Sequence, residues 1–421
     1  MNSLAGVEAR PRARRRFHTT SVAGGLVLVL ALLAWAMPPA YNWDMLAYGA
    51  IALDEGDPEV RHARLWSYVD RDVPAMSAAF LRGQYAEDLA DPRLVDTLDY
   101  RRAIATDPYA FAEQLPFYSV KPMYPATIAA GMRVIDSVSG WFGRPSDVGP
   151  IAVSVLIAKF CWMGLGVAFF LLMRLRFSNA LAALATTIAM AHPMMHSLGS
   201  YSTPDALSGL FILTAFVLAL RDPSRLWTTA ASGVALLALA ARPDNVILLG
   251  LFLTWLLWTS RIRFRWAVVV GGAGVLWYLM IAELSNNYGW SVLMHHSFYD
   301  YAEYPSQLQP QISAFGVLQL YASMVANSAV FFQFVGLGFL FGAIRFNQRG
   351  GQDRLLQALL VMLGFMLVHW LIFPDQKDRL LVGAYLFILA TAAFCIADFV
   401  SAVINRFKQI RMGSETSTGT R

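Results

Sequence analysis

Apolar and polar residues alternate along this chain in blocks of about 20 residues, the length that an α-helix needs to cross a membrane. Short polar segments separate the apolar runs, and one long polar stretch divides the first run from the second. The runs cover residues 20–40, 150–173, 179–197, 205–220, 226–241, 244–260, 265–284, 314–344, 355–373 and 380–404. The pattern predicts an all-α polytopic membrane protein with about ten transmembrane helices.

The run at 314–344 is longer than one span requires. We expect this segment to be tilted or broken near Gly336 and Gly338, since glycine weakens a helix interior. The runs at 205–220 and 226–241 are short, so their ends are the least defined by the pattern.

The segment at 41–149 is the only long connection between apolar runs. It contains 16 Asp and Glu against 10 Lys and Arg, and it lacks a membrane-spanning apolar run. Short amphipathic stretches within it lie at 45–54, 73–90, 109–115 and 123–138. We expect these stretches to be helices on or near the membrane surface.

Lys and Arg gather in alternate connecting segments. If the N-terminus is inside, nineteen of them fall in inner segments, whereas the outer loop at 285–313 has none. Because positive charge favours the cytoplasmic side, residues 1–19 and 405–421 are predicted to be cytoplasmic. A signal peptide ending at Ala36 is the alternative, and it too leaves residue 41 outside.

Composition narrows the class of protein. Hydrophobic residues make up 57% of the chain and charged residues 14%, against about 25% charged in a typical soluble domain. Arg outnumbers Lys 29 to 4, which we read as a bacterial origin and hence a bacterial cytoplasmic (inner) membrane location. The net charge of +5 lies mostly in short loops, so no nucleic-acid partner is expected. Cys161 and Cys395 lie in apolar runs without disulfide or metal-ligand spacing.

A group of charged residues gathers at the outer ends of the runs, whereas the inner ends carry scattered acids and otherwise little but the topology-setting Arg. The outer group includes Asp44, Asp205, Arg242, Asp244 and Arg379. Charges at membrane depth are costly and mark functional sites. A site at the outer face suits a reaction between a lipid in the outer leaflet and a polar molecule outside.

Transfer of a sugar from a polyprenyl phosphate would use such groups. The departing phosphate needs Arg, Lys or a metal ion, and the acceptor hydroxyl needs a carboxylate that takes its proton. In-line displacement places the base and the leaving group on opposite faces of the sugar, which inverts the anomeric centre.

The order of these residues resembles the GT-C class of integral-membrane glycosyltransferases, such as protein O-mannosyltransferases and aminoarabinose transferases. The resemblance covers roughly residues 20–400. It rests on an acid after the first span (Asp44), KPMYP at 121–125, His192-Pro193 before Asp205, and Arg379-Leu-Leu. It implies a polyprenyl-phosphate-linked sugar donor and an extracytoplasmic glycan, lipid or protein as acceptor.

Each candidate site residue has a second interpretation. Asp44 is predicted to be the general base or part of a metal site, or else the N-cap of a helix. Arg379, Arg242 and Lys121 are the predicted phosphate ligands. Alternatively, Arg379 pairs with Asp375 or Asp378, Arg242 pairs with Asp244, and Lys121 lies at the membrane rim.

Further acids define a weaker set of candidates. Glu55 and Asp57 are possible acidic or metal ligands, for Mg or Mn, although a solvated turn before Pro58 fits them better. Asp205 is a third such candidate, and an N-cap of the fourth span is its first interpretation.

The aromatic loop at 285–313 supplies possible acceptor contacts. His295, His296 and Tyr299 are the candidates, with an ordinary loop role or an interfacial aromatic belt as the alternative. Two adjacent histidines point in different directions, so they are not a metal signature.

Two other classes of function compete with a glycosyltransferase. A transporter or lipid flippase would use Lys159, the one charged residue near the middle of a predicted span, although pairing inside the bundle also explains that residue. A non-enzymatic scaffold for envelope assembly would leave the acids facing solvent. The sequence does not indicate the sugar, the acceptor, the isoprenoid length, metal dependence or the oligomeric state.

Overall fold

The computed structural model describes residues 9–83, 98–143, 147–221, 224–299, 301–310, 313–374 and 378–417. The secondary structure of these residues consists of helices joined by turns and loops. These residues form no β-strand, and Ala40 and Tyr201 form an isolated β-bridge. Five helices are long and apolar enough to cross a membrane, which confirms a helical membrane protein. They are α10 (Pro150–Met173), α16 (Phe264–Leu284), α19 (Ala329–Arg349), α20 (Arg354–Ile372) and α21 (Val382–Ser417).

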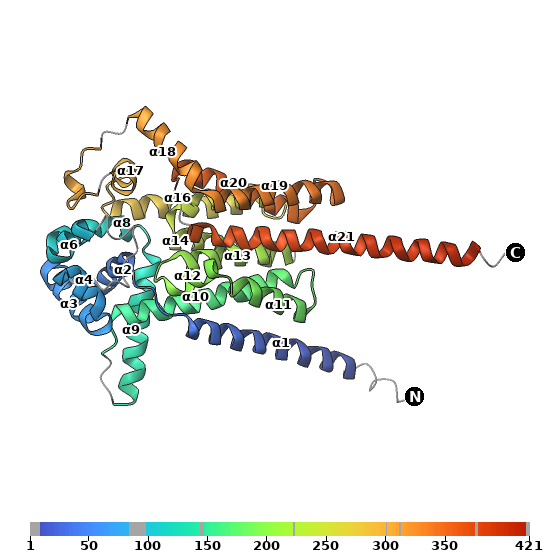
Figure 1. The fold of residues 1–421 in the computed structure, drawn as a ribbon, viewed down its shortest axis with the longest axis horizontal. Helices are drawn as coiled ribbons and strands as arrows, with labels where there is room; N and C mark the ends of the chain where they lie inside the picture. Colours follow the sequence, from blue (N-terminus) through green and yellow to red (C-terminus); the bar gives the residue numbers. More distant parts are fainter. Residues whose placement is uncertain are drawn as a thin grey trace.

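Shorter apolar helices complete the bundle. They are the apolar part Thr20–Ala36 of α1 (Ala9–Ala36) and the helices α11 (Asn179–Met190), α13 (Asp205–Arg221), α14 (Arg225–Ala241) and α15 (Val246–Trp258). The bundle helices run roughly along the long axis in Figure 1, and the start of α1 and the end of α21 lie at the same end of the molecule. The helices of the long polar stretch lie at the opposite end.

Two predicted spans are interrupted. The run at 179–197 divides into α11 and α12 (Pro193–Ser200), because Pro193 cannot continue α11 and the side chain of His192 caps the new helix. The run at 314–344 divides at Ser328 into α18 (Ala314–Asn327) and α19. The expected break near Gly336 and Gly338 is wrong, since both glycines lie inside the continuous helix α19.

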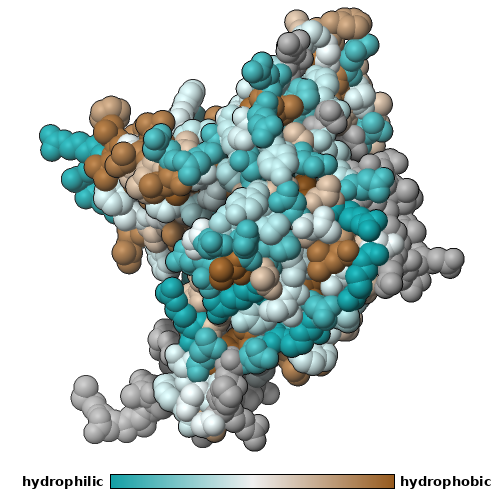
Figure 2. Space-filling model, turned by 90° about the vertical axis from the view of Figure 1, so that its left-hand side faces the viewer, coloured by the Kyte–Doolittle hydropathy of each residue, from teal (hydrophilic) through white to brown (hydrophobic). Residues whose placement is uncertain are grey.

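The long polar stretch folds into helices with a hydrophobic core of their own. These are α2 (Trp43–Leu53), α3 (Pro58–Asp72), α4 (Pro74–Arg82), α6 (Leu98–Thr106), α7 (Pro108–Gln114), α8 (Pro116–Ser119) and α9 (Met123–Trp141). Their core includes Trp43, Leu65 and Phe111 and reaches Ile151 at the start of α10. Figure 2 looks onto this end of the molecule, whose surface is largely hydrophilic with separate hydrophobic patches.

The stretch at 45–54 is helical, as expected, but it does not expose one polar face as an amphipathic helix would. It forms α2, in which residues such as Met45, Leu46 and Ala50 are buried on every side. A helix that is apolar all round belongs in a core, and α2 packs against α9 and α10. By contrast, α9 runs across the bundle axis and exposes Val134, Val138 and Trp141.

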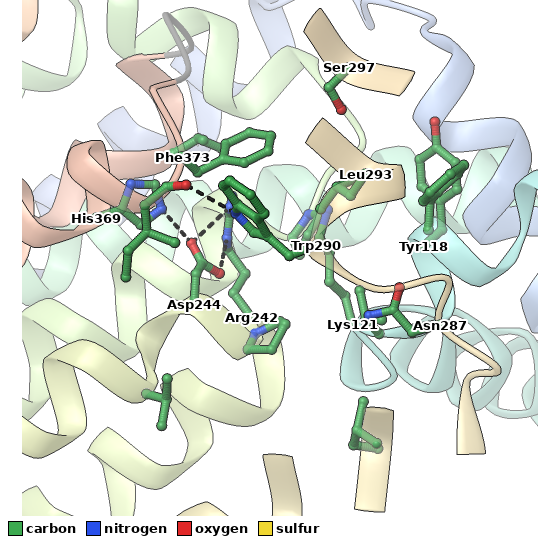
Figure 3. Close-up of a pocket in the computed structure, with 18 of the residues that line it drawn as sticks. Tyr118, Lys121, Arg242, Asp244, Asn287, Trp290, Leu293, Ser297, His369 and Phe373 are labelled. Carbon is green, nitrogen blue, oxygen red and sulfur yellow. Dashed lines mark hydrogen bonds and ion pairs between the residues drawn. The ribbon is translucent and has the colours of Figure 1, made fainter. Parts of the chain in front are cut away.

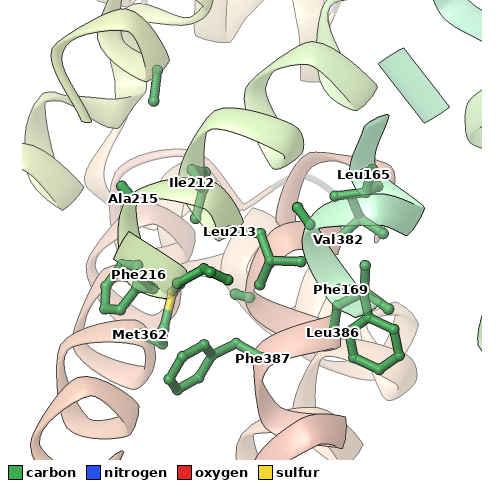
Figure 4. Packing of buried hydrophobic residues seen from close by; sticks show 14 of the residues in the cluster. Leu165, Phe169, Ile212, Leu213, Ala215, Phe216, Met362, Val382, Leu386 and Phe387 are labelled. Atoms are coloured by element: carbon green, nitrogen blue, oxygen red, sulfur yellow. The ribbon is translucent and has the colours of Figure 1, made fainter. Parts of the chain in front are cut away.

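Helix α13 lies at the centre of the bundle, where it packs against α10, α14 and α21. Buried side chains from these helices and from α20 fill the space between them, as Figure 4 shows for Leu165, Phe216, Met362 and Phe387. Where α13 crosses α21, a Cβ added to Gly383 would lie 3.1 Å from the carbonyl oxygen of Gly209. A side chain at Gly383 would therefore press on the backbone at this crossing, about one helical turn beyond Asp205 and Arg379.

Gly383→Ala is predicted to lower the free energy of unfolding by about 1–3 kcal/mol, because the new methyl group separates two tightly packed backbones. Gly336→Ala is the matched control, since a Cβ there meets nothing within 4 Å. The control is expected to be neutral or stabilising by up to about 1 kcal/mol. Thermal unfolding in detergent measures both, and equal melting temperatures for the two variants would contradict the predicted close crossing.

Candidate functional site

A cavity of about 390 Å³ lies where the loop helices meet the bundle. Asp44, Lys121, Arg242 and Arg379 all line it, although they come from distant parts of the sequence. Its wall also includes Tyr48, Tyr118, Asp205, Asp244, Asn287, Trp290, His296 and His369. Figure 3 shows Arg242, Asp244 and His369 joined on one side of this space, with Lys121 and Asn287 on the other. The volume falls in the range of small-molecule sites, about 300–1,000 Å³.

Asp44 reaches the cavity from the first turn of α2. Asn42 is the N-cap, since its side chain accepts the Met45 N–H at 2.8 Å, so the alternative of Asp44 as the cap is wrong. The Asp44 carboxylate instead lies 3.0 Å from Arg379 Nη2 and accepts the Tyr118 hydroxyl at 3.4 Å. The position in the first turn suits a negative charge, because helix N-termini carry partial positive charge.

Asp205 is the most deeply buried carboxylate of the cavity, with a side chain 3% exposed. It is the first residue of α13 and turns toward two arginines instead of acting mainly as an N-cap. Arg242 Nη1 donates to one carboxylate oxygen, and Arg379 Nε lies 3.1 Å from the other. Thr203 Oγ1 donates to the same carboxylate at 2.9 Å. These contacts compensate a charge that would be costly if buried alone.

Arg242 is fully engaged by acids. Its Nε and Nη2 donate to the two oxygens of Asp244 at 3.1 and 3.0 Å, and Nη1 donates to Asp205. Arg242 therefore pairs with Asp244 in this structure, as the second interpretation of this residue predicted. This bidentate geometry fixes the guanidinium plane beside the cavity.

His369 completes the cluster and was not among the residues singled out from the sequence. Its Nε2 lies 2.7 Å from Asp244 Oδ2, on the side opposite Arg242. The available signal was an ionisable residue inside the apolar run at 355–373, which is a functional candidate by default. The resulting row of side chains is Asp44, Arg379, Asp205, Arg242, Asp244 and His369.

Lys121 faces this row from the turn between α8 and α9. Its ammonium lies 5.9 Å from the centre of the Tyr48 ring. Burial and the nearby charge of Arg242 lower the pKa of Lys121 to about 8, against the opposing effect of Asp44 and Asp205. The lysine is thus a cation whose charge depends on pH near the physiological range.

The remaining acidic candidates lie outside the cavity wall. Glu55 pairs with Arg64, and Asp57 caps α3 by accepting the Glu59 N–H at 2.8 Å. In the described ranges, no group of three or more His, Cys, Asp or Glu side chains is arranged to hold a metal ion. Since Asp44 and Asp205 are engaged by arginines, these residues do not fit a Mg or Mn site.

The three residues predicted to contact the acceptor do not all line the cavity. His296 lines the cavity and stacks on Phe117 at 4.7 Å between ring centres. His295 stacks on Tyr299 at 5.8 Å, and neither belongs to the cavity wall. Only His296 is therefore placed to contact a molecule in the cavity.

The contacts of Lys159 and Arg379 bear on the alternative interpretations of these two residues. Lys159 Nζ donates to the carbonyl of Met37 at 3.0 Å, just beyond the end of α1, so this lysine pairs inside the bundle. Asp375 and the side chain of Asp378, the alternative partners of Arg379, lie outside the described residues. Arg379 itself contacts Asp44 and Asp205.

The chain matches no family model, no curated protein and no solved structure. A functional assignment therefore depends on the residues and their geometry. The resemblance to the GT-C class remains a prediction from the order of the motifs.

Arg242→Met is predicted to lower the free energy of unfolding by about 3–5 kcal/mol, because it leaves buried carboxylates uncompensated. Arg82→Met is the control: it breaks the exposed pair with Asp70 and is expected to cost about 0.2–1 kcal/mol. Chemical or thermal unfolding in detergent measures both. Similar losses in the two variants would show that the buried cluster does not depend on Arg242.

Proposed function

We propose that this protein is an integral-membrane glycosyltransferase of GT-C type. It would move a sugar from a polyprenyl-phosphate donor to an acceptor at the outer face of a bacterial cytoplasmic membrane. The observation that carries the proposal is the convergence of a carboxylate, Asp44, with the cations Arg379 and Lys121 in one cavity at the end of a helical bundle.

Asp44 has one role in a single-displacement reaction, and Arg379 and Lys121 have another. The acceptor hydroxyl attacks the anomeric carbon, its proton passes to the Asp44 carboxylate, and the new carbon–oxygen bond forms as the bond to the phosphate oxygen breaks. Arg379 and Lys121 stabilise the charge that develops on the departing polyprenyl phosphate. Attack opposite the leaving group inverts the anomeric centre.

Arg242 has a different role from the phosphate ligand that the sequence predicts. Since Asp205 and Asp244 already occupy its donors, we assign it to positioning the cluster instead of binding phosphate directly. His369 supports the same arrangement through Asp244 Oδ2, the oxygen that also accepts from Arg242 Nη2.

The proposed topology has ten membrane segments with both termini in the cytoplasm. The interrupted runs α11–α12 and α18–α19 each count as one segment. Two features support it: the start of α1 and the end of α21 lie at one end of the bundle, and the cavity lies under the loop helices at the other. The positive residues of the connecting segments favour placing the first of these ends inside.

The contacts of Lys159 and the burial of Asp205 weigh against the competing functions. A transporter that uses Lys159 needs this amine to face a water-filled path at mid-depth, whereas it binds a carbonyl at the end of α1. A passive scaffold gives no reason to bury Asp205 between two arginines, which is costly without further use.

Asp44→Asn is predicted to lower the rate of sugar transfer by about 10²–10⁴-fold, because the amide cannot accept the proton of the acceptor. The variant should remain folded, since Asn keeps the shape of the side chain. Transfer of radiolabelled sugar in liposomes measures the effect.

Glu55→Gln is the matched control for that experiment. It removes one carboxylate from the same region, but Glu55 pairs with Arg64 outside the cavity wall, so its rate should equal that of the wild type. Near-normal transfer by Asp44→Asn would rule out Asp44 as the base.

The charge of Lys121 predicts a pH dependence of donor binding. A donor phosphodiester keeps its single negative charge across this range, so the lysine controls the effect. As the pH rises through about 8, Lys121 loses its proton and the KM for the donor should rise, by about tenfold for one lost charged contact. Initial rates at pH 6.5–9.5 measure this rise.

Lys121→Arg tests whether deprotonation of Lys121 causes the rise in KM. A guanidinium stays charged throughout this range, so the variant should keep a flat KM up to the highest pH used. The same rise in KM in wild type and in Lys121→Arg would show that another group controls donor binding.

A further inference from the structure

Arg379 is shared by two carboxylates that differ in burial. Its Nε lies 3.1 Å from Asp205, whose side chain is 3% exposed, and its Nη2 lies 3.0 Å from Asp44, whose side chain is 29% exposed. The guanidinium also lies over the Tyr201 ring, 5.3 Å from its centre. One ion pair is therefore buried in the bundle, and the other borders the cavity.

The outer pair conflicts with the chemistry proposed for Asp44. A carboxylate beside a guanidinium holds a proton less readily, so it is a poor base while the pair persists. The same guanidinium is a proposed ligand of the donor phosphate. A phosphate and the Asp44 carboxylate would compete for Arg379 Nη2.

We propose, on the basis of the function above, that the donor phosphate displaces Asp44 from Arg379 and thereby releases this carboxylate to act as the base. The site would thus be inactive while Arg379 pairs with Asp44 and active once Arg379 binds the phosphate. The donor would have to bind before the acceptor can be deprotonated, which sets a compulsory order.

The surroundings allow this exchange without moving the arginine. Asp205 keeps its contact with Arg379 Nε and is itself held by Arg242 and by Thr203. The guanidinium presents several donors in one plane, so a phosphate oxygen can replace the carboxylate oxygen there. The Asp44 side chain then has to turn away from Arg379, because attack comes from the face of the sugar opposite the phosphate.

The released carboxylate is not left without stabilisation. Asp44 retains the hydroxyl of Tyr118 at 3.4 Å and its position in the first turn of α2. Lys121 lines the same cavity and can share the phosphate charge. The exchange adds a negative charge, which Arg379 and Lys121 share, and leaves Asp44 with the Tyr118 hydroxyl and the helix start as stabilising contacts.

Binding of polyprenyl phosphate, the donor without its sugar, tests the exchange apart from catalysis. Purified full-length protein in detergent is titrated with this lipid, and binding is followed by calorimetry. Asp44→Asn should bind it about threefold more tightly or better, because a competing ion pair is gone. Asp205→Asn should bind it more weakly, because Arg379 loses its anchor, and Glu55→Gln should match the wild type.

The pattern across the variants separates the possible explanations. Simple repulsion by acids would tighten binding in Asp205→Asn as well as in Asp44→Asn, and that result overturns the exchange. Equal or weaker binding by Asp44→Asn also overturns it, while leaving the glycosyltransferase proposal intact. Failure of the folded wild type and of every variant to bind polyprenyl phosphate would instead overturn the proposed function itself.

Discussion

The arrangement of the cavity depends on one buried carboxylate, that of Asp205, between two arginines. An isolated charge at this depth would be very costly, so the guanidinium groups of Arg242 and Arg379 must reach it. This requirement brings the end of α14 and the start of α21 to the start of α13. The glycine contact between Gly209 and Gly383 allows the two backbones to come close enough for the pairing.

Acids and bases alternate along the cluster, so most charges have a neighbour of opposite sign before any ligand enters. Buried ion pairs add little net stability compared with apolar residues of the same size. Their presence at one end of the bundle is better explained by a substrate that is itself charged. The lipid phosphate of the proposed function would be such a substrate, because its head group would enter the cluster of ion pairs while its tail remained in the membrane.

The sequence pattern was sufficient for the continuous apolar helices. The runs predicted at 150–173 and 265–284 match α10 and α16 almost residue for residue, because hydrophobic length is a local property. It also singled out Asp44, Arg242 and Arg379 by their positions at the ends of runs, and Lys121 through the KPMYP element.

The partners of these residues could not be predicted in the same way. Which acid meets which arginine depends on the crossing of helices far apart in sequence, so Asp205 was first interpreted as a cap. The sequence pattern did not single out His369 within an apolar run, and it predicted an amphipathic helix at 45–54, whereas the packing of its neighbours buries most of α2. The break at Ser328 had no proline to mark it.

The most direct measurement is turnover of a panel of radiolabelled polyprenyl-phosphate sugars by the purified protein in liposomes. Water can serve as a poor acceptor, so slow release of free sugar also counts as turnover. The account predicts that one donor is consumed and that polyprenyl phosphate is released in equal amount. No turnover of any donor, by protein shown to be folded, would contradict the assignment of this cavity to sugar transfer.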